Sequence, residues 1–483
     1  MQQTNLWIGG RWVEPARRVP LLNPHTGETL AEVGYASVEQ AGRAVETAAQ
    51  AFRSFQSVPA HERADILYRV VEILRRRQEE AARIIAQEAA KPITAARGEM
   101  ARTVQTYLFA AEAARAIHGE SIPMDAAPRG ERHTAYTKRV PLGVVSAITP
   151  FNFPFNLVAH KVGPAIAAGN TVVLKPAEQT PLSALFIAEV FREAGLPDGV
   201  LNVIPGDGQE LSEVLTTHPE VKFVTFTGSP RVGKLIRQQA GLRRVTLELG
   251  SNSPLLVDGG FTAEELDRIA QETVVGAFSY NGQVCISVQR VFVHESVFEP
   301  FLTRVVEGAK RLRIGNPLEE STDITALINE AAVRRLQSWL DHAVRRGARV
   351  HCGGQFHGAV MEPTVLTEVP ADAELSCEEA FGPVVVLRPV ATWEEAVHLA
   401  NASKFGLNAG VFTKDIERAM YAADRLESGG VLINQVPTFR VDQMPYGGVK
   451  ESGSGREGVR YAMEDMMDIK LVAIRHGVFP KSL

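Results

Sequence analysis

The spacing of hydrophobic residues changes along the chain, from a helical period to alternating strand and helix. Apolar stripes at helical spacing fill residues 37–116, with Ser37 and His61 near two helix starts. After Gly143, β-branched apolar runs predict strands at 143–149, 171–174, 200–204, 221–226 and 245–249. Helical segments separate them at 181–194, 209–217 and 230–240. This alternation predicts an α/β fold with a doubly wound parallel sheet, which binds ligands at the carboxyl ends of its strands and suggests a nucleotide.

The second half repeats the alternation more loosely. A helix is expected near 262–279 and another at 297–312, with strands at 287–294, 384–387, 409–412 and 431–434. These segments predict a second α/β domain. Two further segments, 133–138 and 468–474, alternate like edge strands and invite pairing with another subunit. The uncharged run 141–159 contains Pro150, Asn152, Pro154 and Asn156, which favours a strand followed by a buried loop over a membrane span.

Composition narrows the class of protein. A chain of 483 residues is longer than a single hydrophobic core usually supports, so two or three domains are expected. The net charge of −5 gives no basic surface for nucleic acid or an anionic membrane, and the amino terminus lacks a signal peptide pattern. Three scattered cysteines form neither a disulfide framework nor a zinc motif, so no metal is predicted and a reducing cytoplasm fits best.

Three short motifs carry candidate chemistry. Gly282 predicts a turn that places Cys285 at the start of a β-branched segment. At the end of such an element the side chain can project into a cleft, where it can form a thiolate and react with a substrate. Gly228 and Ser229 end a strand and begin a helix, an arrangement that favours a phosphate, although alone it is equally a capped helix. In the motif Lys175-Pro176-Ala177-Glu178, the Glu178 carboxylate is suited to accept hydrogen bonds from ribose hydroxyls. It would repel a 2′-phosphate, which favours NAD over NADP.

Together with four further motifs, the chain resembles the aldehyde dehydrogenase superfamily over nearly its whole length. The motifs that carry the resemblance are Thr149-Pro150-Phe151-Asn152-Phe153-Pro154, Lys175-Pro176-Ala177-Glu178, Phe226-Thr227-Gly228-Ser229, Leu247-Glu248-Leu249-Gly250, Gly282-Gln283-Val284-Cys285, Glu378-Glu379-Ala380-Phe381-Gly382-Pro383 and Pro445-Tyr446-Gly447-Gly448-Val449-Lys450-Glu451-Ser452-Gly453. The resemblance implies a Rossmann-like coenzyme domain (1–118 and 142–250), a second α/β catalytic domain (251–450) and a small β oligomerisation arm (119–141 and 460–483).

The resemblance also implies catalytic roles for three residues. Cys285 matches the nucleophile that forms a thiohemiacetal and then a thioester. Asn152 matches the side-chain donor for the oxyanion, with the Cys285 backbone N–H as the second donor. Glu248 matches the general base that activates water for hydrolysis, which argues against acyl transfer to coenzyme A.

Cofactor and substrate positions follow in the same way. Lys175 and Glu178 match ribose-binding positions, and Ser229 matches a position near the pyrophosphate. Glu379 and Phe381 match positions beside the nicotinamide ribose and ring, and Pro150 and Gly228 are assigned to the same cofactor site. The residues expected around the substrate are Phe153, Phe155, Val284, Ile286, Phe439 and Arg440.

Most of these substrate residues are apolar, which predicts a small or medium uncharged aldehyde. Arg440 is the exception: pointing inward it would hold a carboxylate or phosphate, whereas pairing with Asp442 would make it structural. The sequence therefore predicts a cytoplasmic, NAD(P)-dependent aldehyde dehydrogenase that hydrolyses its thioester and forms a homodimer or homotetramer. The alternatives are a semialdehyde or phosphorylated-aldehyde dehydrogenase, possibly using NADP, and a catalytically idle relative that binds nucleotide.

Overall fold

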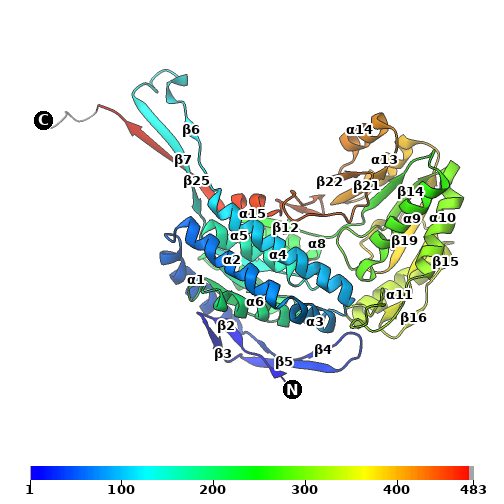
Figure 1. The fold of residues 1–483 in the computed structure, drawn as a ribbon, viewed down its shortest axis with the longest axis horizontal. Helices are drawn as coiled ribbons and strands as arrows, with labels where there is room; N and C mark the ends of the chain where they lie inside the picture. Colours follow the sequence, from blue (N-terminus) through cyan, green and yellow to red (C-terminus); the bar gives the residue numbers. More distant parts are fainter. Residues whose placement is uncertain (1, 478–483) are drawn as a thin grey trace.

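The computed structural model describes residues 2–477, which form two large sheets covered by helices and a projecting arm (Figure 1). The first sheet has eight strands in the order β24-β12-β11-β8-β9-β10-β2-β3. Their bounds are β24 (Gly453–Ser454), β12 (Arg244–Glu248), β11 (Val221–Thr227), β8 (Val144–Ile148), β9 (Thr171–Lys175), β10 (Leu201–Val203), β2 (Leu6–Ile8) and β3 (Arg11–Val13).

The five central strands are parallel, and the chain winds outward from β8 in both directions. It runs through β9 to β10 on one side and then through β11 to β12 on the other, which confirms the doubly wound sheet. The carboxyl ends of β8 and β11 therefore lie side by side where the winding reverses, the place at which such sheets bind ligands.

Helices cover both faces of this sheet with apolar side chains. One face packs against α1 (Val38–Phe55), α7 (Gly208–Thr217) and α8 (Pro230–Gln239). The other packs against α2 (Ala60–Arg76), α3 (Gln78–Glu88), α4 (Ile93–Arg115), α5 (Asn156–Ala168), α6 (Pro181–Glu193) and α15 (Val459–Asp465). Ser37 begins α1 with a capping box in which Gln40 reciprocates.

Helix α5 corrects one expectation, since part of the run 141–159 was predicted to be a buried loop. The prolines restrict only the loop before residue 156, and every residue of the helix that follows is buried. A helix that is apolar all round shows no amphipathic stripe, so its period was not visible in the sequence.

The second sheet has seven strands in the order β15-β18-β19-β14-β13-β21-β22, all parallel except β15. Their bounds are β15 (Arg349–Cys352), β18 (Thr364–Thr367), β19 (Val384–Val390), β14 (Arg290–His294), β13 (Pro254–Val257), β21 (Asn408–Phe412) and β22 (Gly430–Ile433). The helices around it are α9 (Ala263–Phe278), α10 (Glu295–Lys310), α11 (Glu330–Arg345), α12 (Glu374–Cys377), α13 (Trp393–Asn401) and α14 (Ile416–Arg425). Strand β14 begins three residues later than predicted because Ser287 bonds to carbonyls of α9 instead.

The remaining strands form small sheets and the arm. Away from the arm they are β1 (Gln2–Gln3), β4 (Arg17–Leu22), β5 (Thr29–Tyr35), β16 (Phe356–His357), β17 (Val360–Met361), β20 (Phe405–Gly406) and β23 (Val449–Lys450). The arm contains β6 (Ser121–Ile122), η1 (Met124–Ala126), β7 (His133–Pro141) and β25 (Met467–Arg475), and it projects away from the body (Figure 1). Of the segment 460–483 predicted to belong to the arm, residues 460–465 lie in α15 and residues 478–483 lie outside the described residues. Among residues 2–477 no helix is long and apolar enough to cross a membrane.

Candidate active site

Cys285 follows a strained turn at the end of α9. Tyr280, Asn281 and Gly282, in η2 (Ser279–Gly282), all have positive φ angles, of 48°, 56° and 67°. Buried hydrogen bonds hold this conformation: the Tyr280 hydroxyl donates to Ala89 O, and the Asn281 amide donates to Ala326 O. The surrounding structure thus fixes the backbone that presents the cysteine, as expected where strain is retained at a functional site.

The Cys285 sulfur lies 3.0 Å from the hydroxyl oxygen of Tyr446. The cysteine is partly exposed, whereas Tyr446 is buried. Burial raises the pKa of the Cys285 thiol to about 11, and the hydrogen bond with Tyr446 and the charge of Arg440 oppose that rise. The carboxylates of Glu379 and Glu248 add to it. The thiolate in this site therefore depends on nearby hydrogen-bond donors and cations.

Asn152 lies in the loop between β8 and α5 and is brought beside the cysteine turn. Its side-chain amide donates to Gln283 O at 3.0 Å, two residues before Cys285. A buried Lys91 donates to Asn152 O at 2.5 Å and pairs with Glu99 at 2.5 Å. Glu99 also accepts hydrogen bonds from the backbone N–H groups of Phe155 and Asn156 at the start of α5. This ion pair fixes the Asn152 loop, and the amide keeps a second N–H for another acceptor.

Glu248 ends β12 with a carboxyl group that has no hydrogen-bond partner. The residue is 3 % exposed, and both carboxyl oxygens are buried without a partner within the described part of the chain. A Cβ atom on Gly447 would lie 2.8 Å from its Oε1, so the missing side chain there makes room for the carboxyl group. Burial raises the pKa of Glu248 well above its usual value, and the charge of Glu457 adds to the rise.

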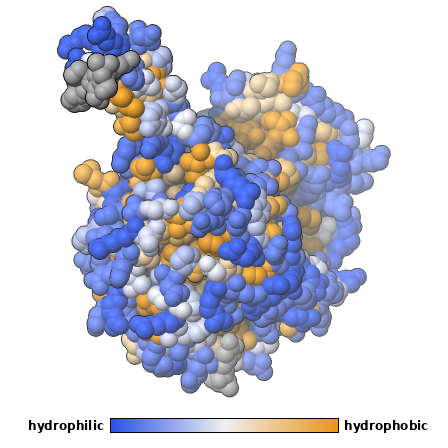
Figure 2. All heavy atoms as spheres, turned by 60° about the vertical axis from the view of Figure 1, so that its left-hand side comes forward, coloured by the Kyte–Doolittle hydropathy of each residue, from blue (hydrophilic) through white to orange (hydrophobic). Residues whose placement is uncertain are grey.

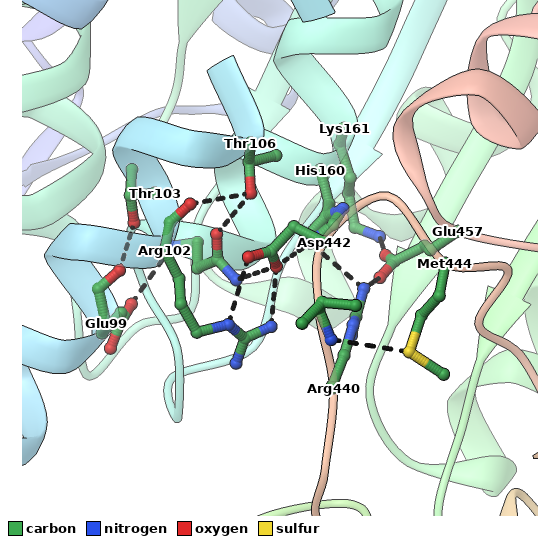
Figure 3. A network of polar contacts seen from close by, with 12 residues as sticks. Glu99, Arg102, Thr103, Thr106, His160, Lys161, Arg440, Asp442, Met444 and Glu457 are labelled. Carbon is green, nitrogen blue, oxygen red and sulfur yellow. Dashed lines mark hydrogen bonds and ion pairs between the residues drawn. The ribbon is translucent and has the colours of Figure 1, made fainter. Parts of the chain in front are cut away.

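Figure 3 shows a network of polar and charged groups that includes Arg102, Asp442, His160, Arg440, Glu457 and Lys161. Glu457 accepts from Lys161 at 2.9 Å and from Arg440 at 3.0 Å. The nearer ring nitrogen of His160 lies 3.1 Å from Arg440 and 2.9 Å from Asp442, which also pairs with Arg102 at 2.7 Å.

The charges of this network are not balanced. Burial alone would raise the pKa of Glu457, but Lys161 and Arg440 bring it far below its usual range. Burial and Arg440 lower the pKa of His160, which favours its neutral form. The cations Arg102, Lys161 and Arg440 then face the carboxylates of Asp442 and Glu457, which leaves one positive charge in excess while the nearby Glu248 is protonated and none once Glu248 ionises.

The residues predicted to bind the adenosine half of the cofactor lie at the carboxyl ends of neighbouring strands. Pro150 follows β8, Lys175 ends β9, and Gly228 and Ser229 follow β11. Glu178 accepts from Lys175 at 3.1 Å and from Gly208 N at 2.8 Å. Ser229 caps α8, and the buried Thr227 hydroxyl has no partner within residues 2–477. A helix start, a partly exposed carboxylate and an unpartnered hydroxyl fit a dinucleotide that lies across the switch point.

The residues predicted to bind the nicotinamide half come from the second sheet and meet the first. Glu379 accepts the Ser251 N–H at 2.9 Å, and burial raises its pKa to about 7. A Cβ atom on Gly250 would lie 2.6 Å from a carboxyl oxygen of Glu379, so a larger residue there would displace this carboxyl group. The Phe381 ring packs edge-on against Phe151, with ring centroids 5.7 Å apart.

The predicted substrate residues divide into two groups. Val284, Ile286 and Arg440 gather around the sulfur: Val284 and Ile286 pack with Cys285 and Tyr446, and the Arg440 guanidinium lies 3.7 Å from the centre of the Tyr446 ring. The remaining residues, Phe153, Phe155 and Phe439, do not share that cluster.

Two expectations for this region need correction: the place of Phe155 beside the substrate, and a pair between Arg440 and Asp442. Phe155 is fully buried against Phe186 in the core, because its backbone N–H is held by Glu99 and its ring faces α6. Phe153 lies against the Lys91 ammonium, and Phe439 is 45 % exposed. Arg440 does not pair with Asp442, because its guanidinium donates to Glu457, while Asp442 pairs with Arg102 and lies 2.9 Å from His160.

Sequence reasoning did not identify Lys91, Glu99, Lys161 and Glu457 as parts of the site, and it assigned no chemistry to Tyr446, which lies in one of the motifs. One signal was present: the uncharged run 141–159 ends at His160 and Lys161, and titratable residues at the edge of a buried segment require partners. Cys352 and Cys377 are free and lie outside this cluster. Within residues 2–477 no group of three or more His, Cys, Asp or Glu side chains is placed to hold a metal.

Comparison with known proteins identifies the family. A model of the Aldehyde dehydrogenase family matches residues 12–472. The chain is 44 % identical to 3-sulfolactaldehyde dehydrogenase of Priestia aryabhattai, covering 98 % of both chains. Among solved structures it resembles aldehyde dehydrogenase 21 of Physcomitrella patens in complex with the product succinate, with a TM-score of 0.96, 39 % identity and 99 % coverage of both chains. It also resembles the NADP complex of glyceraldehyde-3-phosphate dehydrogenase from Bacillus halodurans, with a TM-score of 0.95, 35 % identity and coverage of 98 % and 100 %.

The family model spans nearly all of the described chain, and both sheets have counterparts in solved structures of aldehyde dehydrogenases. The chain therefore belongs to the aldehyde dehydrogenase family and is an enzyme that oxidises aldehydes with NAD or NADP.

Proposed function

We propose that this enzyme oxidises aldehydes that carry an anionic group, through a thioester on Cys285 that Glu248 hydrolyses. The observation that carries the proposal is the buried Arg440 guanidinium, which lies over the ring of Tyr446 while the hydroxyl of that ring contacts the Cys285 sulfur. A cation thus lies one aromatic ring from the nucleophile, in a cluster that also contains the cations Arg102 and Lys161. The uncharged aldehyde expected from the apolar residues becomes the second candidate.

The chemistry follows from the positions of three side chains. The Cys285 thiolate attacks the aldehyde carbon, and the carbonyl oxygen becomes an oxyanion that accepts the free N–H of Asn152. NAD or NADP, held by Lys175, Glu178, Ser229 and Glu379, would supply the hydride acceptor, and loss of the hydride would leave the acyl group on the Cys285 sulfur. Glu248, as carboxylate, takes a proton from the water that attacks the thioester carbon, and the carbon–sulfur bond breaks to release the acid and the Cys285 thiolate.

Some of the relatives support an anionic substrate by the chemistry in their names, whereas others are lactaldehyde dehydrogenases, whose substrate is uncharged. The 3-sulfolactaldehyde of one relative carries a sulfonate, and the succinate bound to another carries a second carboxylate. Arg102 donates to Asp442 and Arg440 donates to Glu457, and because a guanidinium has five N–H donors, each keeps donors that suit such an anion.

The oligomeric state, the location in the cell and the domain bounds belong to the same proposal. The projecting arm suggests a homodimer or homotetramer, and the absence of a cysteine framework in the sequence suits the cytoplasm. We assign residues 1–118 and 142–250 to the coenzyme domain and 251–450 to the catalytic domain, on the basis of the two separate sheets.

The test is a panel of aldehydes of equal length that end in a sulfonate, a carboxylate, a phosphate or a methyl group, each assayed with NAD and NADP. We expect the highest kcat/KM for an anionic aldehyde, and Arg102→Gln should lower that value about tenfold or more with little effect on the methyl compound. Arg97→Gln is the matched control, because Arg97 lies on the same helix with similar exposure and pairs with Glu79 and Glu320. Equal kcat/KM for all four aldehydes would favour the uncharged substrate.

Cys285→Ala tests the nucleophile in the same assay. It should abolish NADH or NADPH production while cofactor binding, followed by fluorescence, remains. Turnover retained by this variant would remove Cys285 from the mechanism.

A further inference from the structure

The Tyr446 hydroxyl is the polar group in direct contact with the Cys285 sulfur, at 3.0 Å. The tyrosine is held from two sides. Its backbone exchanges hydrogen bonds with Glu457, at 3.0 Å and 2.6 Å, and its ring packs with Ile286 and Leu407. A side chain fixed in this way keeps its hydroxyl in one place, so the contact with sulfur is a built feature of the site.

Chemistry decides the direction of this hydrogen bond once the thiol ionises. A thiolate has no proton to donate and accepts hydrogen bonds, whereas a phenol donates one. Burial, together with the charge of Cys285, raises the pKa of Tyr446 well above its usual value, so the phenol keeps its proton. The Tyr446 O–H therefore donates to the Cys285 thiolate.

We propose that Tyr446 is a positioning residue for the nucleophile: its hydroxyl donates a hydrogen bond to the Cys285 thiolate, favours its formation and fixes the sulfur for attack. The proposal rests on the proposed role of Cys285. The bond is strongest while sulfur is charged, before addition to the aldehyde, and again when the thioester breaks and sulfur departs as thiolate. In the covalent stages the sulfur carries no charge and the bond weakens.

Arg440 extends this arrangement to the buried charges. Its guanidinium lies over the face of the Tyr446 ring, where a cation is attracted to the π electrons and makes the hydroxyl a better donor. The same guanidinium is held by Glu457 and His160. The charged and titratable groups that act on the sulfur are thus Tyr446 and Arg440, which favour the thiolate, and Glu379 and Glu248, which disfavour it.

The decisive variant is Tyr446→Phe, which removes one oxygen atom and keeps the ring under Arg440. The rate of Cys285 alkylation by iodoacetamide, measured against pH with the modified residue identified by mass spectrometry, reports thiolate formation without aldehyde or cofactor. We expect the midpoint to rise by about one pH unit, which corresponds to about tenfold slower alkylation below both midpoints. The kcat/KM profile should shift in the same direction, while the KM for cofactor stays unchanged.

Tyr461→Phe, on α15 and 39 % exposed, is the matched control and should leave both profiles unchanged. An unchanged midpoint in a folded Tyr446→Phe enzyme, as judged by cofactor binding, would overturn the proposal. If that variant does not fold, fluorotyrosine at position 446 keeps the shape and strengthens the donor, so the midpoint should fall instead of rise; no fall would also overturn it. Alkylation of Cys285 without loss of turnover would instead refute the nucleophile role itself, a different result.

Discussion

Two buried glutamates close to the same arginine are shifted in opposite directions. Glu457 accepts hydrogen bonds from Lys161 and Arg440, whose charges outweigh burial and lower its pKa. Glu248 lacks any partner in the described chain, so burial dominates and raises its pKa. A carboxylate with satisfied oxygens is inert toward water, whereas an unpartnered one with a raised pKa is suited to take a proton.

From this contrast we expect Glu248→Gln to separate the two halves of the reaction. The amide cannot take a proton from water, so rapid mixing should show one burst of NADH or NADPH per active site, followed by turnover slowed about a hundredfold or more. Glu451→Gln, which alters an exposed carboxylate paired with Lys234, is the control. A missing burst, with Cys285 still open to alkylation, would assign Glu248 to the first half instead.

The raised pKa of Glu248 also predicts the pH dependence of thioester hydrolysis. Only the carboxylate acts as base, so the hydrolysis rate should increase as pH rises through the pKa of Glu248, and that midpoint should lie above the usual glutamate value of 4.5. Single-turnover release of the acid, followed from pH 5 to pH 9, measures this midpoint. A rate already constant at pH 5 would contradict the role of burial.

In the cofactor site, Glu178 is the residue expected to determine the preference for NAD over NADP. Its carboxylate is 40 % exposed beside Lys175, and it would repel a 2′-phosphate. Glu178→Gln should therefore lower the NAD to NADP ratio of kcat/KM by about tenfold. Glu210→Gln, an exposed carboxylate paired with Arg17, is the control, and an unchanged ratio in Glu178→Gln would exclude the residue from cofactor choice.

At the scale of elements, the turn before Cys285 shows how strain is supported. Tyr280 and Asn281 adopt the left-handed region that favours glycine, at a cost of about 1–2 kcal/mol each. Asn281 offsets part of this cost, because its side chain binds Thr325 and Ala326 through three hydrogen bonds. Together with the hydrogen bond from Tyr280 to Ala89 O, these contacts make the turn depend on the assembled molecule.

We expect Gly282→Ala to disrupt this turn. Its Cβ would lie 2.1 Å from Gly382 O, in addition to the unfavourable positive φ. Gly241→Ala is a close control, because Gly241 has a φ of 60° but nothing within 4 Å of its Cβ. The control should lose about 1 kcal/mol of stability and keep full activity, whereas Gly282→Ala should lose several kcal/mol or most of its kcat. Equal melting temperatures and kcat for the two variants would show that the close contact is unimportant.

Elements with a clear period were predictable from sequence, and those without one were not. Strands such as β11 and amphipathic helices such as α7 lie within a residue of their predicted bounds. Helix α5 is buried all round and β13 has four residues, so neither shows a usable period. The site roles came from motif resemblance, whereas the Glu457 partner of Arg440 depends on burial, which the spacing of residues does not reveal.

For the molecule as a whole, the site depends on how the two sheets meet. The link between α3 and α4 contacts the second domain at two successive residues: Tyr280 donates to Ala89 O, and the Thr325 hydroxyl donates to Ala90 O at 2.5 Å. The next residue, Lys91, donates to Asn152 O in the first domain. One short segment thus sets the cysteine turn against the loop of the oxyanion donor. The convergence of Asn152 and Cys285 is a product of this contact and not of either domain alone.

The arm is the part of the molecule whose surface is least explained by a single chain. Strand β25 pairs with β7 on one edge, and within the described chain its other edge has no neighbouring strand. Ile469 and Leu471 are 61 % and 59 % exposed on it, and apolar side chains are visible along the arm (Figure 2). An unpaired edge with exposed apolar residues is a typical subunit contact.

We therefore expect Leu471→Lys to weaken the oligomer, because a lysine at a contact places a charge where apolar surface would be buried. Sedimentation or light scattering should show a lower mass at micromolar concentration, approaching the 52.6 kDa of one chain. Leu242→Lys changes a fully exposed leucine away from the arm and should leave the mass unchanged. If both variants keep the mass of the unmodified enzyme, this face of the arm does not hold the subunits together. If Leu471→Lys is monomeric yet fully active, each chain contains a complete active site, as expected when Cys285, Asn152 and Glu248 all come from one chain.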